Sequence, residues 1–192
     1  MEDKKYVNIT KVYTKRGDKG ETDLLGGSAA RKDSLKVESY GCVDEASSFI
    51  GVARYYCKNK VIKERLKGIQ NKLLVLGGFL ASDERGKEMM KDQIKEEDIK
   101  LLEDYIDEYN QKLPPLKHFI LPGDEEVATH FHVARTVVRR AERRIVSLTA
   151  QEPDLNPLIQ KYVNRLSDLM FVLARYSEEV ENKKWKTSNL NI

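Results

Sequence analysis

The sequence predicts an all-α protein: a five-helix up-and-down bundle, with a four-helix-bundle core plus one helix, preceded by a looped N-terminal arm. From residue 34 onward, apolar residues recur in five stretches at an average step of about 3.5 residues. This spacing places each set on one side of a slightly underwound helix. Before residue 34 the period is absent, and glycines at 17, 20, 26 and 27 interrupt the chain. Glycine admits positive φ, so a looped segment is expected there.

The predicted helices have recognisable ends. Their apolar stripes run through 43–57, 62–80, 99–113, 127–148 and 159–180. Asp33 or Ser34 can cap the first helix and Asp124 the fourth, because a short polar side chain accepts hydrogen bonds from the first turn. Asn156 before Pro157 has the same role for the fifth. Most connections are short, so neighbouring helices should run antiparallel.

A chain of 192 residues has the size of one domain. We expect a single domain at 1–192, with the arm at 1–33, the bundle at 34–180 and a polar tail at 181–192. Within the arm, Tyr6–Ile9 and Val12–Thr14 have the composition of strands.

Composition excludes several classes of protein. The 34 Lys and Arg nearly balance the 31 Asp and Glu, so an anion site must come from local clustering rather than from the net charge of +3. No apolar run approaches the ~20 residues that span a bilayer, and the first residues do not resemble a secretory signal. Cys42 and Cys57 are expected to be buried thiols of a reducing compartment. These observations predict a cytoplasmic protein that binds neither membrane nor nucleic acid.

The first candidate site is the segment Thr14–Thr22. Its glycines let the backbone approach an anion, and Lys15, Arg16 and Lys19 can neutralise one. It is not a Walker A loop, because no Gly-Lys-Ser/Thr opens a helix here. The alternative interpretation is a solvated basic turn.

The second candidate site is an arginine-rich stretch of the fourth predicted helix. Arg135, Arg139 and Arg143 recur every four residues and share one face, which Arg140 and Arg144 flank. Five guanidinium groups with few acids beside them need external anions, and their planar forks suit carboxylate or phosphate. The anions could be acids on other helices, or a ligand.

Other catalytic chemistry finds little support. There are three histidines and no Glu-x-x-His pair, so we predict no resident metal centre. Neither a Gly-x-Ser-x-Gly elbow nor a Cys-x-x-Cys pair occurs. Asn164 could reach a nucleotide or fill an exposed position, and Asp44 could pair with an arginine or be solvated.

Several motifs nevertheless occur together in a characteristic order. They are Tyr13–Thr22, Arg31–Asp33, Tyr40–Glu45, Phe119–Gly123, Arg139–Arg143 and Asn164–Asp168. In this order they resemble the PduO-type ATP:cob(I)alamin adenosyltransferases, from about residue 12 to residue 176.

The resemblance implies a homotrimer with ATP bound between adjacent subunits. The residues it implies for ATP on one subunit are Thr14, Lys15, Arg16, Gly17, Thr22, Asp23 and Lys32. Those of the neighbouring chain are Arg139, Arg140, Glu142, Arg143 and Asn164. It also implies an Asp44–Arg135 salt bridge between subunits and a corrinoid pocket lined by Phe119. Many members have serine where Asp23 stands, and an acid there would repel phosphate. We therefore expect its side chain to point away and its N–H to make the contact.

The implied reaction transfers the 5′-deoxyadenosyl group from ATP to Co(I) of a reduced corrinoid and releases triphosphate. The corrinoid is itself the nucleophile, so the protein needs no Ser–His pair. Its tasks are positioning and neutralisation of the leaving group, with Arg139, Arg143, Lys15 and an ATP-bound Mg²⁺. The product could pass to an adenosylcobalamin-dependent enzyme, and a reductase could supply the electron. The alternative is a non-catalytic helical module that binds a nucleotide or another polyanion.

Overall fold

The computed structural model describes residue 13 and residues 15–180. Its helices are α1 (Leu35–Tyr56), α2 (Lys60–Leu80), α3 (Glu84–Met89), α4 (Glu96–Asn110), α5 (Glu126–Thr149) and α6 (Leu158–Val180). A 3₁₀ helix, η1 (Arg16–Lys19), and two strands, β1 (Glu21–Asp23) and β2 (Ala29–Arg31), precede them. The strand predicted at 6–9, most of that at 12–14 and the polar tail at 181–192 lie outside the described residues.

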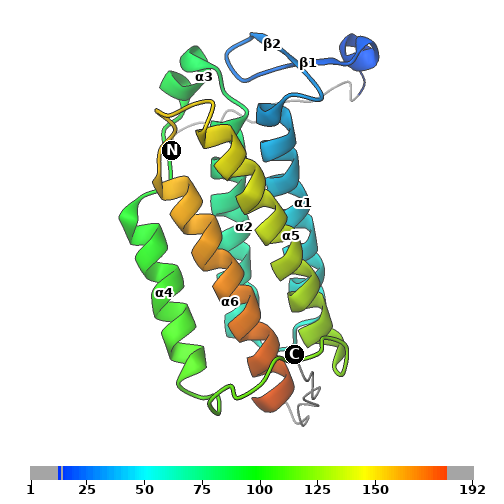
Figure 1. Cartoon of the computed structure of the whole chain (residues 1–192), viewed down its shortest axis with the longest axis vertical. Coiled ribbons are helices and arrows are strands. Elements are labelled where there is room, and N and C mark those ends of the chain that lie inside the picture. Colours follow the sequence, from blue (N-terminus) through cyan, green and yellow to red (C-terminus); the bar gives the residue numbers. More distant parts are fainter. Residues whose placement is uncertain (1–12, 14, 181–192) are drawn as a thin grey trace, which may run out of the picture.

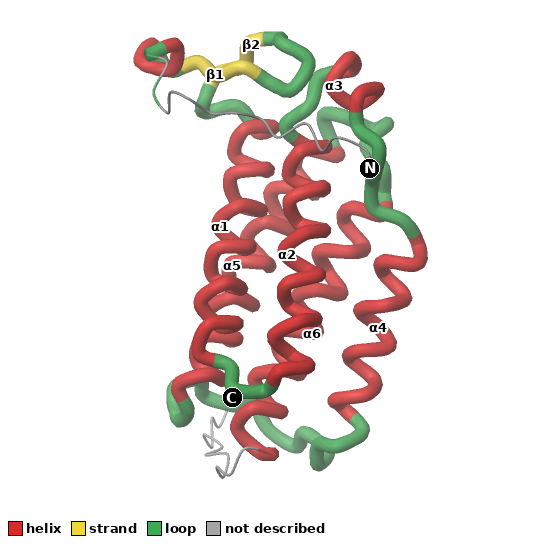
Figure 2. Tube along the Cα trace, turned by 180° about the vertical axis from the view of Figure 1, so that it is seen from behind, coloured by secondary structure: helices red, strands yellow, loops and turns green. Residues whose placement is uncertain are grey.

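The long helices confirm the predicted bundle. Helices α1, α2, α5 and α6 form the four-helix core, in which α5 packs on both α1 and α6, and α1 also packs on α2. Helix α4 is the fifth, and it packs against α6 at one side of the molecule (Figure 1). The arm lies across one end of this bundle, beside α3, as the reverse view shows (Figure 2).

The apolar stripes form the core that holds these helices together. Ile50 of α1, Leu66 of α2, and Phe131 and Ile145 of α5 are fully buried. Burying a side chain of this size contributes roughly 1.5–3 kcal/mol, so the stripes rather than helix propensity stabilise the bundle.

Side-chain caps fix several helix starts. Ser34 Oγ accepts the Val37 N–H at 3.4 Å, as predicted, and Asn156 Oδ1 accepts the Leu158 N–H at 3.0 Å. The predicted cap at Asp124 is wrong. Glu125 takes that position, because its backbone is extended and its longer carboxylate reaches the Ala128 N–H at 2.7 Å.

Three features were not predicted: the 3₁₀ helix η1, the β1–β2 hairpin and the short helix α3. The strands pair antiparallel in the register Glu21 with Arg31 and Asp23 with Ala29. The turn between them is held against the start of α3 by main-chain hydrogen bonds of Leu25, which donates to Ala81 O at 2.8 Å and accepts from Asp83 N at 3.0 Å. These contacts determine where the arm leaves the bundle.

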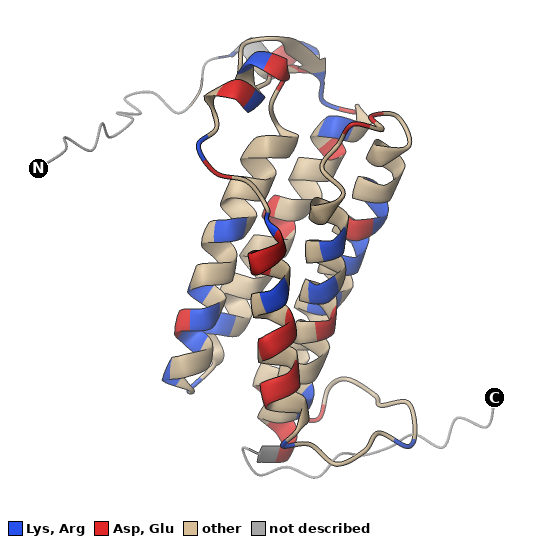
Figure 3. Cartoon of the chain, turned by 90° about the vertical axis from the view of Figure 1, so that its left-hand side faces the viewer, with Lys and Arg blue, Asp and Glu red and all other residues tan. Residues whose placement is uncertain are grey.

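Charge is distributed unevenly over the helices. Acidic residues gather along α4, which faces the viewer in Figure 3. Its carboxylates pair with cations of the neighbouring helices: Glu103 with Arg165 of α6 at 3.0 Å, and Glu108 with Arg65 of α2 at 2.7 Å. The acids of α4 are thus matched largely within the chain. Among the described residues, no helix is long and apolar enough to cross a membrane.

Candidate functional site

The arm brings several predicted residues into one small unit. Lys15 has a left-handed backbone with φ of 62°, and the chain then turns through η1 into β1. Lys32, just beyond β2, donates its Nζ to the Gly17 carbonyl at 2.8 Å. Lys15, Gly17 and Lys32 therefore lie around the same turn, and both lysine side chains are exposed. The predicted residue Thr14 lies outside the described part, and for Arg16 the structure describes only the backbone.

The hairpin separates the side chains of Thr22 and Asp23. Successive residues of a strand point to opposite faces, and here Thr22 is half-buried whereas Asp23 is exposed. A ligand on the Thr22 face would meet the Asp23 main chain but not its carboxylate.

Asp83 anchors the hairpin to α3. Its carboxylate accepts the Ser28 Oγ–H at 2.7 Å, the Ser28 N–H at 3.0 Å and the Gly86 N–H at 2.8 Å. These bonds, the one from the Ser28 side chain foremost, lower the pKa of Asp83 to about 2. Gly86 is required here, because a Cβ would lie 1.9 Å from the Leu25 carbonyl oxygen.

Replacing Asp83 with alanine is expected to loosen the arm without unfolding the bundle. The Ser28 and Gly86 amides lose their acceptor, so their hydrogen exchange should accelerate at least about tenfold. Affinity for ATP, the ligand that the sequence resemblance implies, should fall several-fold by calorimetry. Because the carboxylate stays ionised above about pH 4, wild-type docking should not change with pH there, and should weaken only as pH falls toward 2. Asp92→Ala, which removes an ion pair with Lys72 instead, is the control; equal effects of both changes would contradict this role for Asp83.

The arginines of α5 divide into two groups. Arg140 pairs with Glu45, and Arg144 Nε lies 3.3 Å from Glu38 Oε1, both acids belonging to α1. For these two arginines the anions are therefore acids on a neighbouring helix, which was one of the two interpretations of the arginine-rich stretch.

Arg139 and Arg143 form the second group. Both are exposed, and no acidic partner is found for either among the described residues. Arg143 Nη1 donates to the Arg139 carbonyl at 3.1 Å, a contact that leaves the charges uncompensated. The two guanidinium groups are thus available to an external anion.

Arg135 is more buried than Arg139 and Arg143 of the same helix. Its Nε is buried and has no hydrogen-bond partner in the described structure. Burial, and secondarily the charge of Arg139, lower the pKa of Arg135. Its predicted partner Asp44 is exposed and lines a groove of about 320 Å³ between α1 and α2. No ion pair joins the two within the described chain.

Glu142 and Asn164 meet between α5 and α6. Asn164 Nδ2 donates to Glu142 Oε1 at 2.8 Å, and Arg165 Nη1 donates to Asn164 Oδ1 at 2.8 Å. Arg165 in turn binds Glu103 of α4. The sequence analysis missed the roles of Arg165 and Glu103, because no local pattern pairs residues 62 positions apart.

Phe119 lies in the segment between α4 and α5 and is 74% exposed. Most of its ring is therefore open to solvent. It lies apart in sequence from the arm and from the arginine face, and it stacks on no other ring among the described residues.

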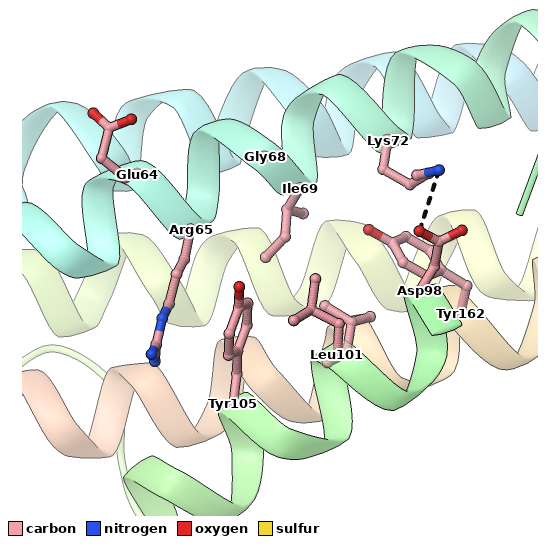
Figure 4. A pocket seen from close by; sticks show the side chains of 10 residues that line it. Glu64, Arg65, Gly68, Ile69, Lys72, Asp98, Leu101, Tyr105 and Tyr162 are labelled. Carbon is pink, nitrogen blue, oxygen red and sulfur yellow. Dashed lines mark ion pairs between the residues drawn. The ribbon is translucent and has the colours of Figure 1, made fainter. Parts of the chain in front are cut away.

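A separate pocket of about 330 Å³ opens between α2 and α4 (Figure 4). Ion pairs bridge it on both sides, Lys72 Nζ with Asp98 Oδ1 at 3.1 Å and Arg65 with Glu108. Tyr105 and Tyr162 also line it. It contains none of the predicted site residues, and its cations already have partners.

His132 gives the α5 helix a pH-dependent stability. Burial, and then the charge of Arg135, lower its pKa to about 4. Between about pH 4 and 6.5 the unfolded chain holds a proton that the folded imidazole does not, so the free energy of unfolding falls by up to about 3 kcal/mol as pH drops through this window. The free energy of unfolding of His132→Phe, measured by denaturant titration at several pH values, should depend less on pH in this window. An unchanged pH dependence of the free energy of unfolding in His132→Phe would contradict this assignment.

The fold and these positions define a class: a helical bundle with a glycine-rich basic arm at one end and, on α5, two exposed arginines that have no acidic partner among the described residues. The chain belongs to the cobalamin adenosyltransferase family, whose model matches residues 12–177.

Relatives of this family cover most of the chain. It is 44% identical over 169 residues to a corrinoid adenosyltransferase of Bacillus subtilis, covering 86% of this chain and 85% of that one. It is 40% identical over 188 residues to the human corrinoid adenosyltransferase MMAB, covering 95% and 74%.

Solved structures agree in fold. A variant PduO-type ATP:corrinoid adenosyltransferase from Lactobacillus reuteri, complexed with cobalamin and ATP, superposes with a TM-score of 0.85 at 36% identity, covering 93% of this chain and 99% of that one. Another variant of that enzyme, complexed with ATP, gives a TM-score of 0.84 at 36% identity, covering 93% and 100%.

Proposed function

We propose that this protein transfers the 5′-deoxyadenosyl group from ATP to the cobalt of a reduced corrinoid, giving adenosylcobalamin and triphosphate. The observation that carries this is the pair Arg139 and Arg143. Both are exposed and have no acidic partner in the part of the chain that the structure describes, whereas Arg140 and Arg144 of the same helix are paired. The relatives complexed with cobalamin and ATP support the same substrates.

ATP is held between two copies of the chain in a homotrimer. In one chain, the described hydrogen bonds and ion pairs of the α5 arginines involve α1 and α5, and none involves Lys15 or Lys32 of the arm. Lys15 and Lys32 of the arm, like Arg139 and Arg143 of α5, have no acidic partner among the described residues. A triphosphate between the arm of one subunit and α5 of the next satisfies both.

The Asp44–Arg135 pair supports this assembly. Arg135 has a buried Nε without a partner, and Asp44 is an exposed carboxylate beside an open groove. A guanidinium that is partly desolvated is stabilised by a carboxylate, and none of the same chain's described residues pairs with Arg135. The neighbouring subunit would supply Asp44.

The residues divide the chemical work. Lys15, Lys32, Arg139 and Arg143, with an ATP-bound Mg²⁺, neutralise the charge that develops on the departing triphosphate. The main chain of Gly17 and Asp23 and the hydroxyls of Thr14 and Thr22 contact the nucleotide beside Arg16. Arg140, Glu142 and Asn164 contribute from the adjacent subunit. These contacts place the ribose 5′-carbon in line with cobalt, and Co(I) supplies the electron pair.

Phe119 lines the corrinoid pocket. Its exposed ring occupies the lower axial side of cobalt and keeps the lower base away. Because Co(I) prefers fewer ligands than Co(II), removal of that base eases reduction. A reductase would deliver the electron, and the product would pass to an adenosylcobalamin-dependent enzyme. The buried thiols Cys42 and Cys57 fit a reducing compartment such as the cytoplasm.

The test is turnover by the purified protein. With ATP, Mg²⁺ and chemically reduced cobalamin, a light-sensitive adenosylated product should form with one triphosphate released per cobalt. ATP binding without any transfer would contradict the proposal and favour a non-catalytic nucleotide-binding module.

A further inference from the structure

The segment that carries Phe119 has few hydrogen bonds to the helices among the described residues, and Ile120 lies in an isolated β-bridge. The segment runs from residue 111 to residue 125 and passes the lower end of α6 on its way from α4 to α5 (Figure 1). Its residues 114–119 are all exposed. Such a segment does not hold an aromatic ring in one place by its own packing.

Arg175 of α6 attaches this segment to the bundle. Its side chain is buried, with 4% of the residue exposed, and its Nη2 donates to the Pro114 carbonyl at 2.6 Å. Among the described residues, this is the hydrogen bond that joins 114–124 to a helix. The buried position and short distance indicate a well-defined anchor.

The other contacts of Arg175 show that this bond is its main hydrogen-bonding interaction. The nearest carboxylate, Glu179 Oε1, lies 3.7 Å from Nη2, beyond an ordinary hydrogen bond. Nε of Arg175 is buried and has no partner among the described residues. A guanidinium is costly to bury without hydrogen bonds. The bond from Arg175 to the Pro114 carbonyl offsets part of this cost and holds the loop at that point.

The two prolines at the anchored position restrict the backbone that leads to Phe119. Pro114 is followed by Pro115, and each proline ring fixes φ near −65°. A residue that precedes proline is also restricted to extended conformations. Fixing the Pro114 carbonyl therefore fixes the direction in which the chain leaves toward Phe119, four residues beyond Pro115.

We propose that Arg175 is a positioning residue for the corrinoid end of the site. It holds the segment Pro114–Phe119 against the C-terminal end of α6. The Phe119 ring thereby keeps the position in which it displaces the lower axial base of the corrinoid. Arg175 itself touches no substrate. This inference rests on the proposed function.

The experiment compares Arg175→Met and Arg175→Lys with the wild-type trimer. Arg175→Met should raise KM for cobalamin at least about tenfold and leave KM for ATP within about twofold. In the same variant, a smaller fraction of cob(II)alamin should lose its lower base in the presence of ATP, as measured by visible absorbance. Arg175→Lys keeps one cationic donor and should restore part of both readouts.

A corrinoid without a lower base distinguishes a loss of Phe119 positioning in Arg175→Met from a general loss of protein stability. With cobinamide there is no base to displace, so the Arg175→Met defect should be markedly smaller than with cobalamin. A variant that is merely less stable would lose ATP and both corrinoids alike, and that result would overturn the inference.

A second variant serves if Arg175→Met does not fold. Pro115→Gly lies on the exposed segment, leaves the core untouched, and releases the chain between the anchor and Phe119. It should give the same cobalamin-specific defect, whereas Pro153→Gly, at an exposed proline of the α5–α6 connection, should behave as wild type. An unaltered KM for cobalamin in Pro115→Gly would overturn the inference.

The two proposals fail differently. If the wild-type protein binds ATP but transfers nothing, the proposed function is wrong. If the wild-type protein is active and the Arg175 and Pro115 variants match it for cobalamin, the function stands and the positioning role of Arg175 is wrong.

Discussion

Arg139→Ala is expected to lower kcat/KM for adenosyl transfer at least about 100-fold, a loss of about 3 kcal/mol of transition-state stabilisation. The guanidinium lies in the middle of the α5 face and has no acidic partner among the described residues, so its charge is available to the departing triphosphate. Because the side chain is exposed and packs into no core, the helix and the proposed trimer should persist. Steady-state kinetics, circular dichroism and size-exclusion chromatography measure these effects.

Arg144→Ala is the matched control on the same helix. Arg144 pairs with Glu38 on the surface, at 3.3 Å, and exposed pairs contribute ~0–1 kcal/mol. Its loss should change kcat/KM by no more than about twofold. Full activity of Arg139→Ala, or an equal loss in Arg144→Ala, would mean that the arginine face has no specific role in the transfer.

Asp44→Ala is expected to dissociate the trimer or to weaken it strongly, with activity lost in proportion. In the proposed assembly this carboxylate reaches Arg135 of the adjacent copy, whose Nε is already buried within its own chain. Removing one partner leaves an uncompensated, partly buried charge, which costs about 3–5 kcal/mol at each of the three contacts. Analytical ultracentrifugation across a dilution series measures the change in assembly.

Reversing the pair tests whether the two residues meet. Asp44→Arg and Arg135→Asp should each disrupt the trimer, whereas the double variant should recover part of the assembly and of the activity. Additive loss in the double variant would show that the two side chains are not partners. Because both single variants retain the buried core of the bundle, their helix content should stay near that of the wild type.

The long helices could be predicted from sequence because their apolar stripes directly encode burial. Ile50, Leu66 and Phe131 all lie on predicted stripes and are all fully buried. Helix α3 is six residues long, too short to show a helical period. The hairpin likewise has no alternating pattern, and its place depends on Asp83, which lies 55 residues from Ser28.

The candidate site was predictable only in part. Arg139 and Arg143 were recognised as one face, but the sequence could not say which of the five arginines had acids beside them. That depended on Glu38 and Glu45, which meet α5 only because α1 packs antiparallel to it. Arg175 gave no signal at all, because its interaction partner is a main-chain carbonyl, and no side-chain pattern records a carbonyl acceptor.

The uncompensated guanidinium groups of Arg139 and Arg143 have a consequence for the empty protein. Side chains of equal sign one helical turn apart repel each other by a few tenths of a kcal/mol, and nothing in the described chain offsets this repulsion. A nucleotide that binds there removes the penalty and adds its own binding free energy, about 2.7 kcal/mol at a hundredfold excess over Kd. Saturation with ATP should therefore make the enzyme melt several degrees higher, so that its abundance would follow the supply of its own co-substrate.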